Sequence, residues 1–255
     1  MLQRTESARI PVLAGVTKEN DTTNLSGDSG WVLFRKMVRQ PQSPTISRIA
    51  TAKRTNRVMH NPPAGKEKRL RAVCVFCGSS PGRDRRHAEA ARELGTLLAA
   101  NGFSLVFGGG NIGLMGEVAR AIRAGGAPVV GILPKFLEHL EPPLRSAEEL
   151  IVTPDLQQRK QRMLALADAF VILPGGLGTL DEYFEVLTSA QLHALGKPIL
   201  LVNIAGYFDP LKALLDHVVR EGFANRSLFE LQQIVADPKE AIATLLLKLP
   251  AAGTV

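Results

Sequence analysis

The sequence predicts an α/β fold in which a mostly parallel sheet carries helices on both faces. From Arg71 onward, apolar runs of strand length alternate with segments whose apolar residues recur at helical spacing. Such alternation is typical of parallel strands joined by crossover helices. Glycine-rich turns follow three of the apolar runs, at 78–82, 108–113 and 175–178. In doubly wound, Rossmann-like sheets the ligand lies at the carboxyl ends of the strands, so these turns are expected to meet at one crevice.

Strands and helices are expected in succession along this region, which we take as a single domain at 70–250. The expected strands are short runs dominated by apolar residues, at 72–77, 103–107, 128–133, 150–152, 169–173, 198–202 and 233–235. The expected helices are 84–100, 112–124, 155–167, 180–195, 208–221 and 238–248. The helix at 180–195 takes its apolar positions from Leu180, Phe184, Leu187, Leu192 and Leu195.

Residues 1–69 do not fit this pattern. They show no sustained period of a strand or a helix and are rich in Ser, Thr, Asn, Pro, Arg and Lys, with one apolar patch at 31–34. Too little apolar surface is present to offset the chain entropy, so a disordered basic segment is expected. Three alternatives stay open: a misassigned start upstream of Met59, a targeting peptide, and a basic arm for an acidic partner.

The net charge of +7 is confined to the same front segment. Residues 1–69 hold thirteen Lys and Arg against five Asp and Glu, and the rest of the chain is close to neutral. The folded region therefore has no electrostatic support for nucleic-acid binding. No apolar run reaches the roughly 18 residues of a membrane-spanning helix, and two cysteines cannot make a disulfide framework. We expect a cytoplasmic protein that binds neither nucleic acid nor membrane.

The stretch 174–182, Pro-Gly-Gly-Leu-Gly-Thr-Leu-Asp-Glu, is the most informative motif. It joins an expected strand to a helix, and the amides at a helix N-terminus are unpaired and lie at the positive end of the helix dipole. Glycine lets the backbone approach an anion closely. Thr179 adds a hydroxyl, and Glu182 adds a carboxylate one turn inside the helix. The motif predicts a phosphate or nucleotide site with an acid beside it, which is more than a simple turn requires.

The turn 108–113, Gly-Gly-Gly-Asn-Ile-Gly, matches the dinucleotide motif G-x-G-x-x-G. Two observations argue against NAD. The turn follows the second strand of the domain, and about 20 residues later Pro134 and Lys135 stand where an acid should bind ribose. A mononucleotide or a sugar phosphate is the better ligand, with Gly109 and Gly110 as candidate substrate contacts.

Metal and redox sites are not expected. Cys74 and Cys77 are spaced as C-x-x-C, but inside a strand this spacing points the two side chains to opposite faces, so core packing is expected for both. The histidines show no metal-ligand spacing.

The helix expected at 155–167 carries Arg159, Lys160 and Arg162. Charged residues on a helix usually form a solvated face, and this is the expectation for Arg162. Arg159 and Lys160 belong to a helix that leads into the strand before 174–182, so two cations could face the phosphate turn. From the residues alone, a functional role and a solvated one stay equally open.

The order and spacing of these motifs resemble the LONELY GUY (LOG) family of cytokinin riboside 5′-monophosphate phosphoribohydrolases, whose members were long mislabelled as possible lysine decarboxylases. The resemblance covers about residues 70–250, in the segments CVFCGSS, FGGGNIGLMGEVA, ILPKFLEHLE, DLQQRK, PGGLGTLDEYFEVLT and GKPILLVN. It implies hydrolysis of the N-glycosidic bond of purine nucleoside 5′-monophosphates, of the AMP or isopentenyl-AMP class, to free base and ribose 5-phosphate. It implies no cofactor and no metal, and a homodimer or higher homo-oligomer to which the helix 180–195 contributes.

The resemblance also assigns roles to residues. Arg159 and Glu182 match the catalytic pair of the family. Further substrate contacts are implied at Glu141, Lys160, Gly175, Gly176, Leu177, Gly178, Thr179, Leu180, Asp181 and Thr188. One position departs from the family pattern, since Gln157 replaces the usual His. This difference bears on the preferred base and on the rate, not on the reaction class.

The implied roles suit the chemistry of glycosidic cleavage, which builds positive charge on the sugar and negative charge on the leaving base. Glu182 would stabilise the sugar cation and orient water, Arg159 would act on the leaving side or hold the ribose, and the glycine amides would anchor the 5′-phosphate. Two other classes stay open. A carrier of a nucleotide-like group such as molybdenum cofactor would not need the Arg159–Glu182 pair, and a DNA-binding protein would not suit the near-neutral body.

Overall fold

The structure is a computed structural model that describes residues 71–138, 143–144, 147 and 149–249. The front segment 1–69 and Glu141 lie outside the described residues. The strands are β1 (Arg71–Phe76), β2 (Phe103–Phe107), β3 (Val129–Pro134), β4 (Glu149–Thr153), β5 (Ala169–Ile172), β6 (Ile199–Val202) and β7 (Gln233–Val235). The helices are α2 (Arg85–Ala100), α3 (Gly113–Ala124), α4 (Leu156–Leu166), α5 (Leu177–Gln191), α6 (Asp209–Arg220) and α7 (Pro238–Lys248). Short 3₁₀ helices are η1 (Lys135–Leu137), η2 (Ile204–Gly206) and η3 (Arg226–Glu230).

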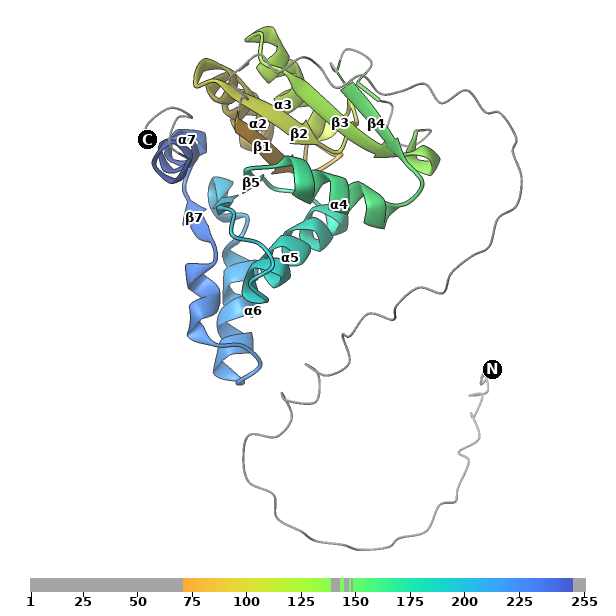
Figure 1. The fold of residues 1–255 in the computed structure, drawn as a ribbon. Coiled ribbons are helices and arrows are strands. Elements are labelled where there is room, and N and C mark those ends of the chain that lie inside the picture. Colours follow the sequence, from red (N-terminus) through yellow and green to blue (C-terminus); the bar gives the residue numbers. More distant parts are fainter. Residues whose placement is uncertain (1–70, 139–142, 145–146, 148, 250–255) are drawn as a thin grey trace, which may run out of the picture. The chain divides into compact units, whose positions relative to one another are not determined.

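The described strands form one sheet in the order β4-β3-β2-β1-β5-β6-β7, and every neighbouring pair is parallel. The chain builds outward from β1 to β4, then returns to place β5 on the other side of β1 (Figure 1). The strand order therefore reverses between β1 and β5, and ligands of open parallel sheets bind at such a point. The predicted α/β class with a parallel, doubly wound sheet is confirmed.

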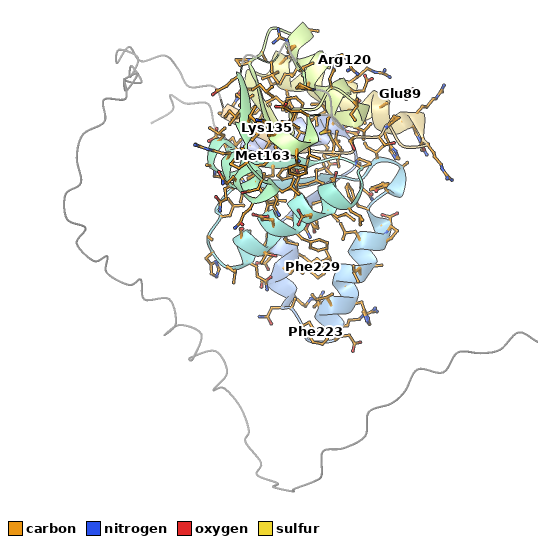
Figure 2. The ribbon with its side chains drawn as sticks, turned by 90° about the vertical axis from the view of Figure 1, so that its right-hand side faces the viewer. Glu89, Arg120, Lys135, Met163, Phe223 and Phe229 are labelled. Carbon is orange, nitrogen blue, oxygen red and sulfur yellow. The ribbon has the colours of Figure 1, made fainter. Side chains whose placement is uncertain are left out.

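Helices cover the sheet on both faces, and each face has its own apolar core. Leu94 of α2 and Ile122 of α3 pack on one face, together with α7. Met163 of α4 and Tyr183 of α5 pack on the other face, together with α6 (Figures 1 and 2). Apolar burial on both faces explains why the strands read as continuous apolar runs. Within the described part of the chain, no helix combines the length and the apolar character needed to cross a membrane.

Aspartate side chains define the N-termini of three helices. The side chains of Asp84, Asp155 and Asp237 accept hydrogen bonds from backbone amides in the first turns of α2, α4 and α7. These caps satisfy amides that have no acceptor inside the helix. α5 differs because Gly176 at its N-cap provides no side-chain acceptor. The first amides of α5 are therefore available to a ligand.

The position of α5 corrects the prediction for this helix. It begins at Leu177, before the expected 180, because Gly176 already serves as its N-cap. It ends at Gln191 because His193 has a φ of 56°, a left-handed conformation that terminates helices.

The apolar face expected for this helix is only partly buried. Leu187 is buried, whereas Phe184 is 37% and Leu192 70% exposed. Tyr183 and Val186 instead make the contact with the sheet. Part of the predicted core face is therefore an exposed apolar strip.

Candidate active site

Two adjoining pockets open at the carboxyl ends of β1 and β5. The smaller, of about 230 Å³, is lined by Cys77, Gly78, Ser79, Met115, Arg159, Gly176, Leu177, Gly178, Thr179 and Glu182. The larger, of about 450 Å³, is lined by residues 78–84, His87, Leu114, residues 174–176 and Tyr207. Gly78, Ser79 and Gly176 line both pockets. Two of the three predicted glycine-rich turns thus share one crevice at the switch point of the sheet.

Arg159 reaches into the smaller pocket from α4. Its Nε donates a hydrogen bond to the carbonyl of Ile132 at 3.1 Å, and its Nη2 donates to the carbonyl of Gly108 at 3.3 Å. A buried guanidinium needs such acceptors to offset its lost hydration. Gly108 is itself required here, because a Cβ at that position would collide with the guanidinium of Arg159. The ends of β2 and β3 therefore hold the cation in place.

Glu182 lies on α5 and faces Arg159. Its Oε1 is 3.8 Å from Nη2 of Arg159, and the two side chains are only 12% and 9% exposed. A pair this well buried is less screened by salt and water than a surface pair. The structure brings the predicted acid and the predicted cation together in one pocket.

The N-terminus of α5 supplies one wall of the same pocket. Gly176, Leu177, Gly178 and Thr179 line it, and the first amides of a helix have no acceptor within it. A Cβ added at Gly176 or Gly178 would meet nothing within 4 Å, so both glycines face open space. An anion can approach this wall without obstruction and meets the positive end of the helix dipole.

The turn 108–113 contributes differently. Gly109 and Gly110 do not line either pocket. Gly109 has a φ of 82° and packs against β3, and Gly110 forms a β-bridge with Pro143. Gly113 has a φ of 55°, and a Cβ there would collide with the backbone of Ser79. The glycines of this turn permit close packing of backbone segments behind the crevice.

Lys160 lies beside the crevice and is held by two carboxylates. Its Nζ is 3.0 Å from Oδ2 of Asp181 and 2.5 Å from Oε2 of Glu185. Burial by itself would lower the pKa of Lys160, but the hydrogen bonds to Glu185 and Asp181 outweigh it, and the pKa is raised. Lys160 therefore remains charged and ties α4 to α5, and it does not line either pocket.

Several predicted contacts lie away from the two pockets. Leu180 lines a separate apolar groove, and Thr188 and Gln157 are exposed. Asp181 is exposed and engaged with the lysine described above. Glu141 lies outside the described residues. The roles of these residues in binding stay predictions.

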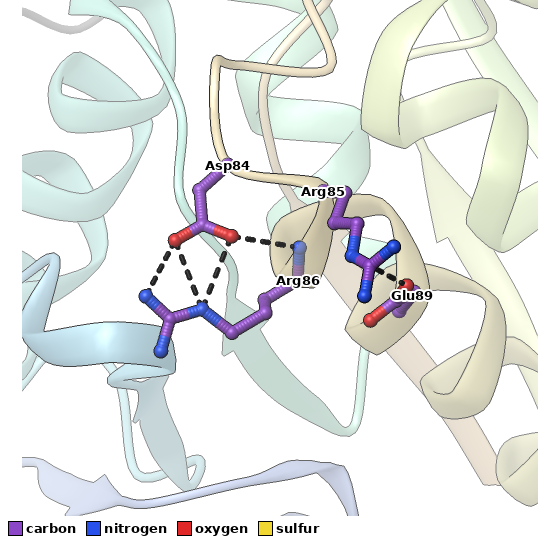
Figure 3. A network of polar contacts seen from close by, with 4 residues as sticks. All are labelled: Asp84, Arg85, Arg86 and Glu89. Carbon is purple, nitrogen blue, oxygen red and sulfur yellow. Dashed lines mark hydrogen bonds and ion pairs between the residues drawn. The ribbon is translucent and has the colours of Figure 1, made fainter.

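The rim of the larger pocket is polar where α2 begins. Asp84 accepts hydrogen bonds from the amide of Arg86 at 2.9 Å and from its Nη2 at 2.6 Å, and Arg85 pairs with Glu89 one turn further on (Figure 3). The hydrogen bonds from Arg86 lower the pKa of Asp84 from 3.8 to about 2. The carboxylate is therefore ionised across the physiological range and fixes the start of α2.

Sequence reasoning missed several residues that line the crevice, among them Cys77, Met115 and Tyr207. Cys74 and Cys77 belong to the cores on opposite faces, as predicted, and burial raises the pKa of the Cys74 thiol. Cys77 is buried but also lines the smaller pocket, so core packing is only part of its role. Tyr207 lies after β6. The common edge formed by the ends of parallel strands is the signal that could have located it.

Comparisons with known proteins show the family to which this chain is related. The family described as "Possible lysine decarboxylase" matches residues 115–245. A rice protein (Oryza sativa subsp. japonica) named "Probable cytokinin riboside 5'-monophosphate phosphoribohydrolase LOGL2" is 44% identical over 70% of this chain and 73% of its own length. An Arabidopsis thaliana protein named "Cytokinin riboside 5'-monophosphate phosphoribohydrolase LOG3" is 41% identical over 71% of this chain and 84% of its own length.

Solved structures with this fold include more distant proteins. A molybdenum cofactor binding protein from Rippkaea orientalis is 24% identical, with a TM-score of 0.54 over 69% of this chain and 96% of that chain. The molybdenum cofactor carrier protein of Chlamydomonas reinhardtii is 22% identical, with a TM-score of 0.54 over 71% of this chain and 99% of that chain. At these identities the likeness shows a common fold and nothing about a shared ligand.

Proposed function

The chain belongs to the LONELY GUY family of cytokinin riboside 5′-monophosphate phosphoribohydrolases, and from this premise we propose that it hydrolyses the N-glycosidic bond of purine, cytokinin-type nucleoside 5′-monophosphates. The products are the free base and ribose 5-phosphate. The observation that carries the proposal is the buried pair of Arg159 and Glu182, 3.8 Å apart, beside the uncapped N-terminus of α5. An anion site and an acid in one pocket suit a phosphorylated sugar as substrate.

Glu182 is the group proposed to act at the sugar. Departure of the base leaves an oxocarbenium-like ribose whose positive charge a nearby carboxylate stabilises. The same carboxylate can accept a proton from the attacking water. Its side chain lies on a helix and is largely buried, which strengthens both effects.

Arg159 is proposed to act on the leaving side or on the ribose. Its guanidinium is fixed by two backbone carbonyls, so little reorganisation is needed when negative charge develops on the departing base. It also lies 3.8 Å from the carboxylate of Glu182, so the two charged groups face the same reacting sugar.

The N-terminus of α5 is proposed to bind the 5′-phosphate. Gly176, Leu177, Gly178 and Thr179 offer backbone amides at the positive end of the helix. Binding energy from this remote group then places the glycosidic carbon at Glu182. The nucleotide, rather than the nucleoside, is therefore the proposed substrate.

A carrier function, like that named for the molybdenum-cofactor neighbours, finds no specific support in this site. A carrier needs the open amides but has no use for an ion pair buried at the same place. Incubating the protein with AMP, GMP, CMP and isopentenyl-AMP and separating the products distinguishes the two functions. We expect free base and ribose 5-phosphate in equal amounts from a purine nucleotide. Recovery of intact nucleotide with tight binding would support the carrier instead.

A homodimer is proposed from the exposed apolar surface between α5 and α6. A groove of about 430 Å³ there is lined by Leu180, Phe184, Tyr207, Phe208, Pro210, Leu211 and Leu214. Leu192 continues the apolar surface at the end of α5, where it is 70% exposed. Exposed apolar patches of this kind mark contact surfaces.

Light scattering after gel filtration tests this assembly. We expect Phe184→Asp to shift the protein toward monomer, because it places a charge in the groove. Leu247→Asp is the matched control, since Leu247 is 85% exposed on α7. An unchanged mass for Phe184→Asp would contradict the proposed interface. We further propose a cytoplasmic location, on the cysteine usage of the sequence, and no nucleic-acid partner, on the near-neutral charge of the folded region.

A further inference from the structure

Tyr207 connects the end of β6 to the glycine-rich turn at the start of α5. Its hydroxyl donates a hydrogen bond to the carbonyl of Gly175. The neighbouring carbonyls are also engaged, since Pro174 accepts from the amide of Gly78 at 3.0 Å and Gly176 accepts from the amide of Leu180 at 3.1 Å. The carbonyls of residues 174–176 therefore all accept hydrogen bonds from protein groups. At Gly175 the donor is a side chain, the hydroxyl of Tyr207.

The segment that carries Tyr207 contains a strained backbone position and is held by side-chain hydrogen bonds. Ala205 has a φ of 56° and a ψ of 27°, a left-handed conformation that is unfavourable for a residue with a Cβ. The side chain of Asn203 accepts from the amide of Phe208 at 2.7 Å and donates to Asp209 at 2.8 Å. Such strain persists only where surrounding bonds over-determine the backbone, and it concentrates at functional sites.

The ring of Tyr207 is held as well. It makes edge-to-face contacts with His87, at 5.6 Å between ring centroids, and with Phe208, at 5.0 Å. The hydroxyl is therefore directed at Gly175 by the ring contacts and by the turn beneath it. The phenol also forms part of the wall of the larger pocket.

The bond to Gly175 acts on the next amide. The carbonyl of Gly175 and the N–H of Gly176 belong to one planar trans peptide, so they point in opposite directions. A donor on the carbonyl polarises the peptide and makes its N–H a stronger donor. Tyr207 therefore influences the amide of Gly176, a residue that lines both pockets.

We propose that Tyr207 is a positioning residue for the substrate phosphate, acting through the peptide between Gly175 and Gly176. This inference rests on the proposed function, because it assumes that the anion at the start of α5 is the phosphate of a nucleotide. Tyr207 fixes the orientation of the turn and strengthens its first exposed amide. It does not touch the glycosidic bond.

Tyr207→Phe tests the inference, because it removes the hydroxyl and keeps the ring. The matched control is Tyr183→Phe, since Tyr183 is the other tyrosine of the chain and its hydroxyl donates to Gln232 at 2.7 Å, away from the pockets. The measurements are the KM and kcat for AMP, the inhibition constants of ribose 5-phosphate and of adenine, and calorimetric binding of ribose 5-phosphate. Thermal unfolding of each variant monitors the fold.

We expect Tyr207→Phe to raise the KM for AMP and to weaken ribose 5-phosphate binding by about threefold to tenfold, the range of one hydrogen bond. The kcat for AMP and the inhibition by adenine stay within about twofold, because the inference gives this turn a role with the phosphate and none with the base. Tyr183→Phe changes neither affinity. A merely structural role of Tyr207 would instead weaken adenine and ribose 5-phosphate alike, or change neither, and either result overturns the inference.

The wild-type protein separates this inference from the function on which it rests. If wild-type protein releases no adenine from AMP and does not bind ribose 5-phosphate, the proposed function fails, and the inference fails with it. If wild-type protein binds ribose 5-phosphate and Tyr207→Phe binds it equally well, only the inference about Tyr207 is wrong.

Discussion

The two glycine-rich turns at 108–113 and 174–178 are similar in sequence but differ in their structural roles. Both follow a strand and open a helix without a side-chain cap. In the first, Gly109 and Gly113 have positive φ angles and lie against neighbouring backbone. In the second, Gly176 and Gly178 have no atom within 4 Å of an added Cβ. Gly175 of the second turn is also closely packed, since an added Cβ would meet Thr179 and the amide of Gly78. Glycine therefore permits close packing in both turns, and in the second it also leaves access for a ligand at Gly176 and Gly178.

The comparison teaches that a glycine motif locates a turn without revealing what the turn contacts. The dinucleotide-like spacing of 108–113 is explained by packing of the turn against β3 and against the turn after β1. The site lies where glycine is accompanied by Thr179 and Glu182, which a packing turn does not need. Substitutions in the two turns should therefore separate activity from stability.

Loss of the acid should have the largest effect. We expect Glu182→Gln to lower kcat for AMP by at least about 100-fold, the usual scale of a positioned acid–base group, with the fold retained. Glu221→Gln, on the exposed end of α6, is the control and should keep normal turnover. Steady-state kinetics on both variants decides the matter, and near-normal turnover by Glu182→Gln would leave its assigned role without support.

The packing turn should respond in stability. We expect Gly113→Ala to lower the free energy of unfolding by about 2–3 kcal/mol, because the residue combines a left-handed φ with a collision against Ser79. Gly102→Ala is the matched control: its φ is 69°, but an added Cβ would meet nothing within 4 Å. Denaturant unfolding should show a smaller loss for Gly102→Ala. Equal losses of unfolding free energy in the two variants would show that the close contact of Gly113 with Ser79 does not affect stability.

The ligand turn should respond in affinity. We expect Gly176→Ala to raise the KM for AMP about tenfold while the free energy of unfolding changes by less than about 0.5 kcal/mol, since the methyl enters the space in front of the amides. Gly196→Ala provides the control, because it too has open space around it and lies outside the crevice. A destabilised Gly176→Ala with unchanged KM would reverse the contrast between the two turns.

The last effect, confined to high pH, concerns α5 itself, the helix that carries the site. Burial raises the pKa of Tyr183 to about 12, against a partial lowering by its bond to Gln232. Because the unfolded chain ionises near pH 10, it loses its proton first, and stability falls as the pH rises from about 10 to 12. Denaturant titrations between about pH 10 and 12 measure this loss. The free energy of unfolding should fall by about 1–3 kcal/mol less in Tyr183→Phe than in the wild-type protein. Parallel losses in both proteins would contradict the raised pKa.

The alternation of elements was predictable from the sequence because the central strands β1, β2, β3, β5 and β6 are largely buried on both faces and read as apolar runs, whereas the edge strands β4 and β7 are partly exposed. The buried face of α5 was not predictable, because Leu180, Phe184 and Leu192 suggested one buried face, whereas Tyr183 and Val186 make the contact with the sheet. Apolar residues on both sides of a helix do not tell which side faces the core.

The pairing of Arg159 with Glu182 was expected from the family resemblance, whereas from the residues alone a functional role for Arg159 stayed open. Tyr207 was not predicted, since it is placed by a short strained turn around Ala205, and such turns leave no periodic signal. The surroundings of Lys160 were also hidden, because its two carboxylate partners lie on a different helix. Contacts between helices depend on packing that no local pattern specifies.

The most direct test compares the release of adenine from AMP and from adenosine by the wild-type protein. It asks whether the start of α5 binds a phosphate while Glu182 acts at the sugar. The account predicts adenine and ribose 5-phosphate from AMP and much slower release from adenosine. Equal rates on the two compounds, or no adenine from either, would contradict it.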